Sequence, residues 1–512
     1  MSRTWKILAV SLLIGAAHRG WAQDNPVPQP EGNPGQVQEP VPAYGQDSPP
    51  SPSNENPPLS GLDLPSLEPH ATPMSYLQAG ATLNESADSN VGNSLGGGSF
   101  TSVSRALATL TLHRVWSTYD LGLGYVGGVG YYNVAGQGVK SLQQVNLDSK
   151  LSWKRGQLAL IDSFSYLPEG TFGGSYGALG SQGIQSLGNT AFSSFWGGTA
   201  LGAIGLASHI TNVSMASLEQ SLTPRSTVTA TAGYGLTHFF GNEFSGISYI
   251  GSSQISAQAG YNRILTSHTQ VALVYGYQGF DFTVAGSSFH SHVAEGLFGH
   301  RISGRMDLLI GAGPQLTLLN TQSAICNPAS VPVFLCTAFG GTLGQSTQKS
   351  TNLGVAAQAR LRYQFTKSSL SVNYERLQTN GGGVFAGAQS DIVRAALSRP
   401  LTRIWRMQFD IGYTHNDRVQ PLTLQQVTQC TASSFTQGSC PANDATSYQT
   451  GFAGAALDRA FGRSWHMFAS YQFNELAFDS SFCLTSTPCN RISNRQIVTL
   501  GLDWTPRPMR LD

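Results

Sequence analysis

Residues 353–365 read LGVAAQARLRYQF, and the apolar residues of this stretch fall on every second position. The positions between them are small or polar and include Arg360 and Arg362. Successive side chains of a β-strand point to opposite faces, so the stretch is predicted to be a strand with one apolar and one polar face. In a soluble sandwich the apolar face points to a core. In a membrane barrel it points to lipid, and the arginines face the interior.

The composition favours the barrel. Charged residues are 11% of the chain, against roughly a quarter in ordinary soluble domains. The net charge of +1 indicates no nucleic-acid partner. No stretch reaches the ~18 apolar residues that a membrane-spanning helix requires. Because backbone polar groups must be paired in lipid, a closed barrel is the alternative to a helix.

Two segments precede the repeating pattern. Arg3 and Lys6 come before the apolar run 7–17, and Gly20-Trp21-Ala22 offers small residues for cleavage, so residues 1–22 are predicted to be a signal peptide. Fourteen of the 25 prolines fall within residues 26–73. Such a composition does not bury enough apolar area to order the chain, so residues 23–73 are predicted to be a disordered periplasmic linker. A partner-binding arm is the alternative.

From residue 74 the alternating pattern recurs, and residues 74–512 are predicted to form the barrel. At about 24 residues for each strand with its connection, the spacing suits spanning strands of ~10 residues. The eighteen predicted strands are Met74–Leu83, Leu107–His113, Leu121–Tyr125, Val145–Trp153, Leu158–Tyr166, Val213–Leu222, Thr227–His238, Ile255–Arg263, Gln270–Gln278, His292–Gly299, Asp307–Leu318, 353–365, Leu370–Glu375, Asp391–Ser398, Trp405–Asn416, Gln449–Leu457, Trp465–Asn474 and Gln496–Trp504.

The predicted connections alternate between short and long along the whole series. Short ones such as Lys154–Gln157 are followed by long ones such as Leu167–Asn212, and the long series includes Asn320–Thr351 and Leu377–Ser390. Outer-membrane barrels have short periplasmic turns and long external loops. The alternation therefore predicts both termini in the periplasm and an even number of strands.

All six cysteines fall in three of the long connections. They are predicted to form local disulfides, although six cysteines allow fifteen connectivities. A metal site is not predicted, because no CxxC spacing or histidine cluster accompanies them. The predicted pairs are Cys326–Cys336, Cys430–Cys440 and Cys483–Cys489.

Four tryptophans lie at one end of the predicted strands. Trp153 and Trp504 close strands that run toward short turns, and Trp405 and Trp465 open strands that leave them. Tryptophan rings collect at the boundary between lipid and water, so this placement predicts an aromatic girdle on the side of the short turns.

On these features the chain resembles the porin-like β-barrels of Gram-negative outer membranes, over roughly Ser75–Thr505. The resemblance rests on architecture and includes no ligand motif. It implies an all-β, transmembrane, antiparallel up-and-down barrel in the outer membrane. The implied partners are outer-membrane lipid, the barrel-assembly machinery and small polar solutes. Such barrels commonly end on an aromatic residue, whereas here Trp504 is followed by residues 505–512.

The polar faces of the strands supply candidates for the lumen lining. Mixed charge across a lumen can tune passage, or the same charges can pair as structural ladders. The loop 167–212, rich in glycine and aromatic residues, is the predicted constriction, with an adhesive external loop as the alternative. The lumen-lining candidates are Arg360, Arg362, Arg394, Arg406, Asp148, Lys150, Asp307, Glu375, Asp410 and Asp503.

No enzyme, catalytic residue, cofactor or metal is predicted. Residues 173–177 fit GxSxG, but that motif needs a strand-to-helix turn. Residues 122–127 fit GxGxxG without a following helix, and His290 and His292 have no carboxylate neighbours in sequence. Two functions remain: a porin-like channel for small polar solutes or oligosaccharides, and a structural or adhesive surface barrel with a plugged pore. The sequence does not predict the oligomeric state.

Overall fold

The structure is a computed structural model of the full chain. The residues that it describes fall into separate stretches. They are residues 58–60, 75–92, 94–134, 138–168, 208–240, 243–244, 247–283, 287–327, 342–419, 445–480 and 490–511. The predicted signal peptide lies outside them, as does most of the predicted linker.

Eighteen long strands and one two-residue strand form a single antiparallel sheet. The long strands are β1 (Tyr76–Asp88), β2 (Thr101–Val115), β3 (Tyr119–Tyr132), β4 (Gly138–Trp153), β5 (Gly156–Leu167), β6 (His209–Thr223), β7 (Ser226–Phe239), β10 (Ser252–Thr266), β11 (Thr269–Phe282), β12 (Ser288–Ser303), β13 (Met306–Asn327), β14 (Thr342–Gln364), β15 (Ser369–Thr379), β16 (Ala388–Pro400), β17 (Trp405–Arg418), β18 (Ser447–Phe461), β19 (Trp465–Phe478) and β20 (Ile492–Trp504). A separate small ribbon pairs β8 (Glu243–Phe244) with β9 (Ile247–Ser248).

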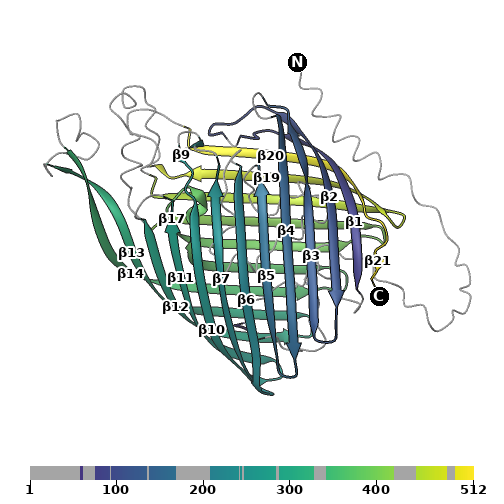
Figure 1. Cartoon of the computed structure of the whole chain (residues 1–512), viewed down its shortest axis with the longest axis horizontal. Coiled ribbons are helices and arrows are strands. Elements are labelled where there is room, and N and C mark those ends of the chain that lie inside the picture. The colour runs from purple at the N-terminus through teal and green to yellow at the C-terminus, as the bar shows by residue number, and fades with distance from the viewer. Residues whose placement is uncertain are drawn as a thin grey trace, which may run out of the picture. The chain divides into compact units, whose positions relative to one another are not determined.

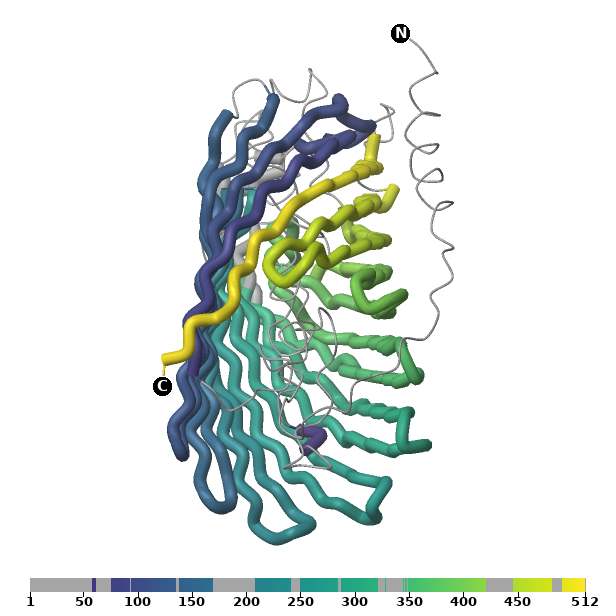
Figure 2. The backbone as a smooth tube through the Cα atoms, turned by 90° about the vertical axis from the view of Figure 1, so that its right-hand side faces the viewer, coloured from purple at the N-terminus to yellow at the C-terminus, as the bar shows by residue number. Residues whose placement is uncertain are grey.

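The sheet closes on itself. Each long strand pairs with its neighbours in the chain, and β1 also pairs with β20, from Ala81 opposite Trp504 to Asp88 opposite Ile497. The short strand β21 (Met509–Arg510) extends this seam, because Met509 lies opposite Leu77. Figure 2 shows the purple and yellow strands meeting at the seam. The predicted up-and-down barrel of eighteen strands is confirmed.

Each of the eighteen predicted segments overlaps one long strand, and the short turns fall where the alternation placed them. The chain continues past Trp504 into β21, so the seam includes residues beyond the last aromatic position. Within the described part of the chain, no helix is long and apolar enough to cross a membrane.

One predicted connection was wrong. Residues 320–351 were expected to be a loop, but β13 runs to Asn327 and β14 begins at Thr342. The pairing of β12 with β13 ends at Asn320, whereas the pairing of β13 with β14 continues. Strands β13 and β14 therefore extend as a two-stranded ribbon beyond the wall (Figure 1). The alternation of apolar and polar residues stops there, because a ribbon outside the wall has no lipid face to cover. The backbone of Cys326 therefore lies in a strand, opposite Leu343.

The two faces of the wall differ in exposure as the alternation predicts. Aliphatic side chains on the outer face are open, with exposed fractions of 67% at Leu273, 74% at Leu353 and 60% at Leu500. Polar residues of the inner face are covered, for example Ser256 and Thr499, both 1% exposed. Large exposed aliphatic surface is unfavourable in water, so this outer belt fits a lipid environment.

Tryptophans mark the rim at the short turns. Trp153 and Trp504 end β4 and β20, and Trp405 and Trp465 begin β17 and β19. Trp465 lies opposite Trp504, with ring centroids 6.4 Å apart. The predicted common end of these four residues is confirmed.

A polar cluster interrupts the outer belt near the middle of β5. Asp162 lies opposite Leu147 on one side and Ser214 on the other, so its side chain is on the outer face. The Ser214 hydroxyl donates to the Asp162 carboxylate, and Asn212 lies 3.4 Å from the same carboxylate. These hydrogen bonds supply partners to a carboxylate on a face that otherwise contacts lipid.

The assignment of faces can be tested on β11. Leu273→Arg places a charge on the lipid-facing side. It should destabilise the barrel folded in detergent or lipid by roughly 2–4 kcal/mol. Gly276→Arg is the matched control on the inner face, where a Cβ atom would have no neighbour within 4 Å. Reversible unfolding in urea measures both. Equal losses in the two variants would contradict the assignment.

Candidate channel constriction and lumen

A loop between β15 and β16 folds into the interior of the barrel. It contains residues Asn380–Gly387, with the sequence NGGGVFAG, and every residue from 377 to 388 is buried. The 3₁₀ turn η2 (Gly381–Gly383) begins at Asn380, whose side-chain oxygen accepts a hydrogen bond of 3.1 Å from the Gly382 N–H. All three glycines of the turn have positive φ, between 63° and 80°, which residues with a Cβ atom rarely adopt.

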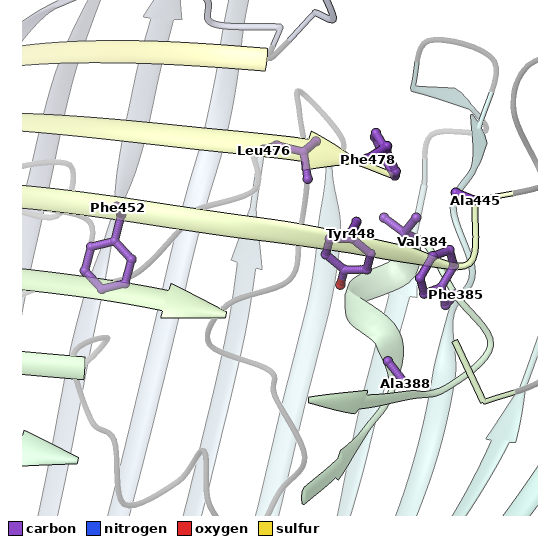
Figure 3. Close-up of a cluster of buried hydrophobic side chains, with 8 residues drawn as sticks. All are labelled: Val384, Phe385, Ala388, Ala445, Tyr448, Phe452, Leu476 and Phe478. Carbon is purple, nitrogen blue, oxygen red and sulfur yellow. The ribbon is translucent and has the colours of Figure 1, made fainter. Parts of the chain in front are cut away.

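One side of this loop packs against β18 and β19 (Figure 3). Val384 and Phe385 join a buried cluster with Tyr448, Leu476 and Phe478. The Phe385 and Tyr448 rings meet edge to face, with centroids 5.1 Å apart. The Tyr448 hydroxyl donates a hydrogen bond of 3.1 Å to the Gly381 carbonyl, so the ring holds both the apolar side chain and the backbone of the loop.

The other side of the loop contacts the wall around β10–β13. Ala386 lies in a second buried cluster with Phe280, Phe289 and Leu319. The Ile250 N–H donates a hydrogen bond of 2.8 Å to the Gly383 carbonyl. The two sets of contacts hold the loop inside the ring of strands, at the end where the long connections lie.

Two glycines permit this approach. A Cβ atom on Gly383 would lie 2.7 Å from the Phe239 ring, and one on Gly387 would lie 2.5 Å from the Phe289 ring. Tyr249 stacks on Phe239 at 5.0 Å, and burial raises the pKa of its phenol, which therefore stays neutral.

The loop that is seen to fold inward differs from the predicted constriction 167–212, which stays a prediction. Residues 169–207, most of the predicted constriction, lie outside the described residues, as does the GxSxG stretch. Leu377–Ser390 was predicted only as a long external loop, and Asn380–Gly387 within it is the segment that folds inward. The signal was the apolar trio Val384-Phe385-Ala386 between glycines, because an external loop has no reason to carry such a patch.

The predicted lumen residues all share the inner face by register, opposite to the exposed aliphatic belt. Arg362 lies opposite Asp307, Arg360 opposite Asn373, and Glu375 opposite Gln358. The remaining register partners are Asp458 for Arg406, Gly454 for Asp410, Gly412 for Arg394, His466 for Asp503, Gly122 for Asp148 and Asp120 for Lys150. Their role in passage stays a prediction.

Several of these charges form cross-strand ion pairs. The Arg394 Nε donates a hydrogen bond of 2.9 Å to Asp410 Oδ1, and a second bond joins Nη2 to Oδ2. The side chains are 14% and 3% exposed. Arg301 Nε lies 3.4 Å from Asp307 Oδ1 in a more open position. For Arg394 and Asp410 the structural-ladder alternative is therefore the one with direct geometric support.

Sequence reasoning missed a buried ion pair across the closing seam. Arg495 of β20 reaches Asp88 of β1, with Nη2 2.6 Å from Oδ2 and both side chains at most 4% exposed. Ser86 beside Asp88 lies 2.9 Å from Thr499. Pairing of the first and last strands was the signal that would have brought these residues together.

Residues 122–127, the GxGxxG match, lie within β3. His290 and His292 lie on the outer face of β12, within 2.9 Å of the Tyr277 hydroxyl and 2.8 Å of the Tyr275 hydroxyl. Among the described residues, no group of three or more His, Cys, Asp and Glu side chains is placed to hold a metal ion. Apart from Cys326, the cysteines lie outside the described residues, so the disulfides stay predictions.

Comparisons with known proteins find distant structural similarity and no match by sequence. No family model and no curated protein matches the chain. The structure is similar to Pseudomonas aeruginosa OccK2 (OpdF), with 9% identity, a TM-score of 0.39 and coverage of 85% of this chain and 98% of that one. Pseudomonas aeruginosa OprD gives 8% identity, a TM-score of 0.36 and coverage of 86% and 98%. The E. coli ferric-catecholate receptor Fiu gives 9%, 0.40, 85% and 82%.

The closed antiparallel wall, the apolar outer belt and the tryptophan rim decide the architecture. This is a closed antiparallel β-barrel with the outer face of a membrane-spanning protein. In this barrel, the polar inner face and the inward loop Asn380–Gly387 form the candidate functional site.

Truncation of Phe385 should widen the lumen. Phe385→Ala removes a buried ring, a change that costs about 3–5 kcal/mol in a packed core. The lost stability should be confined to the loop, because backbone hydrogen bonds between the strands stabilise the wall. We expect a larger single-channel conductance with unchanged folding of the barrel. Phe473→Ala on the outer face of β19 is the control; an equal rise in conductance there would contradict this role.

The Arg394–Asp410 pair can be tested by a double-mutant cycle. Arg394→Met leaves a buried carboxylate unpaired and should destabilise the barrel by about 3–5 kcal/mol. Arg394→Met combined with Asp410→Leu should recover most of this loss, since no buried charge is left alone. Urea unfolding of the two single variants and the double variant measures the coupling. Additive losses would show that the two side chains do not interact.

Proposed function

We propose that the protein is a passive channel of the outer membrane for small polar solutes or oligosaccharides. The observation that carries the proposal is a closed barrel of eighteen long strands whose inner face is polar and whose interior is narrowed by the loop Asn380–Gly387. Barrels of 16–18 strands are wide enough to enclose an aqueous channel. The loop then sets the size of the solute that passes.

Hydroxyl and amide groups supply much of the inner face, and several of them are only partly buried, for example Asn146, Ser217, Ser371, Asn373 and Gln408. Neutral polar side chains bind sugars and other uncharged polar solutes by hydrogen bonds that are individually weak, so that a solute can enter and leave. The paired charges at Arg394–Asp410 and Asp88–Arg495 add little net field. This balance supports neutral polar solutes over strongly charged ones.

A surface-binding role is the second candidate, and the β13–β14 ribbon favours it. β14 pairs with β15 only from Ala357 onward, whereas its pairing with β13 continues to Thr342. Beyond the wall the ribbon therefore presents strand edges that a partner can pair with. With short turns in the periplasm, as proposed here, the ribbon lies outside the cell.

The proposal predicts conductance in a planar bilayer. The barrel purified from outer membranes should form pores that admit small saccharides, and Arg360→Gln combined with Arg362→Gln should shift the reversal potential in a salt gradient toward cations. Two positive charges on one stretch of wall favour anions in a narrow pore. Arg399→Gln, on the outer face of β16, is the matched control.

A barrel that inserts without conducting would overturn the channel and favour the surface-binding role. Conductance with selectivity unchanged by the Arg360 and Arg362 substitutions would assign those arginines to the structure of the wall.

A further inference from the structure

Two residues that precede β1 in the chain lie against the inner wall. Leu59 and Ser60 belong to the region that the sequence predicts to be a linker, and they contact β7, β10, β11 and β12. In Figure 2 they are the short purple piece beside the teal strands. Ser60 is 2% exposed, so the contact is extensive.

The wall binds Ser60 through both its backbone and its side chain. The Ser60 N–H donates a hydrogen bond of 2.9 Å to Asn262 Oδ1, and the Asn262 amide donates back to the Ser60 hydroxyl. Gln258 Nε2 donates to the Ser60 carbonyl at 3.2 Å. Thr229 Oγ1 lies 2.5 Å from Ser60 Oγ. Asn262 itself is 3% exposed, so its amide finds its partners in the docked residue and the wall.

Leu59 fills an apolar patch on a face that is otherwise polar. Ala272, Val274 and Leu297 form this patch, each at most 7% exposed, and Leu59 packs against it. Ala272 lies between Asn262 and Leu297 in the register of the sheet, so the apolar patch adjoins the hydrogen-bonding groups. Leu59 therefore packs on the apolar patch, and Ser60, the next residue, reaches the adjoining hydrogen-bonding groups.

Two glycines provide the space for these side chains. A Cβ atom on Gly260 would lie 2.3 Å from the Ser60 Cβ, and one on Gly299 would lie 2.6 Å from Leu59 Cδ2. Either atom would clash with the docked segment. The wall is therefore shaped for this backbone as well as chemically matched to it.

The position along the lumen agrees with entry from the side of the short turns. Asn262 lies four residues before the end of β10, and Thr229 three residues after the start of β7, both near short turns. β1 also begins at this rim. Fourteen residues, 61–74, separate Ser60 from Ser75 and can extend to about 50 Å. That exceeds the ~35 Å diameter that interstrand spacing and tilt give for eighteen strands.

We propose that this inner wall is a docking site for the chain's own Leu59–Ser60 segment, which occupies the lumen near its periplasmic mouth. Docking does not depend on the proposed channel function. Obstruction of solute passage by the docked segment does rest on it, and the two are measured separately below.

Disulfide trapping in the full-length mature protein tests docking. Ser60→Cys with Thr229→Cys places two sulfur atoms where two oxygens now lie 2.5 Å apart, and mild oxidation should join them. Ser60→Cys with Thr231→Cys is the control, because Thr231 is on the same face about 7 Å further along β7. The linked peptide is identified by mass spectrometry, which separates it from native cysteine peptides. Equal yields in the two pairs, in a folded barrel, would overturn docking.

A third substitution tests the recognition chemistry. In the background of the trapping pair the Ser60 hydroxyl is already absent, so Asn262→Leu removes the remaining hydrogen bond, which the N–H of residue 60 donates to Asn262 Oδ1. It should lower the rate of cross-linking several-fold. Gln254→Leu, on the same face of β10 nearer the long connections, should leave the rate unchanged. An equal decrease in both variants would contradict specific recognition by Asn262.

Conductance of the trapped protein tests obstruction. The oxidised Ser60→Cys/Thr229→Cys protein, in which the segment is held in place, should conduct several-fold less than the Asn262→Leu protein, in which docking is weakened. Equal conductance of the two proteins would overturn obstruction while leaving docking in place. If cross-linking succeeds but neither protein conducts, the proposed channel fails and docking stands.

Discussion

The structure depends on pairing every backbone N–H and C=O group in a lipid environment. A sheet achieves this only by closing, and here closure requires β1 to meet β20 across the full length of the chain. The Asp88–Arg495 ion pair and the continuation of the chain into β21 both lie at this seam. Once the ring is closed, the outer face must be apolar and the inner face is free to carry polar groups. The polar lining of the lumen is thus a consequence of the closure of the sheet.

Glycine has two different roles in the interior. In the loop Asn380–Gly387 it provides left-handed backbone and lets the chain approach aromatic rings of the wall. At Gly260 and Gly299 the backbone is ordinary strand, and the missing Cβ atom makes room for Leu59 and Ser60. In the first case glycine shapes the segment that enters the lumen. In the second it shapes the wall that receives a segment.

The sequence predicts what is local and periodic. Alternation of apolar and polar residues, such as Leu361 and Arg362, assigns the two faces of each strand. The lengths of the connections assign the order of the strands. Neither pattern reports which loop folds inward, because the contacts of Gly383 with Ile250 join residues far apart in the chain. The docking of Ser60 against Asn262, 202 residues away, is invisible for the same reason. The ribbon of β13 and β14 was missed because strand pairing outside lipid needs no apolar face.

The seam also bears on how the barrel forms. Asp88 and Arg495 are 407 residues apart in the chain, so their contact joins the first and last long strands of the ring. Such a contact forms only after the last strand has been made, and the entropy of closing the loop is lost at a single late step. Hairpins between neighbouring strands can form earlier, since each closes only a short stretch of chain. The edge of β1 that pairs with β20 must therefore stay unpaired until β20 is in place, so the topology itself sets the order of the last assembly step.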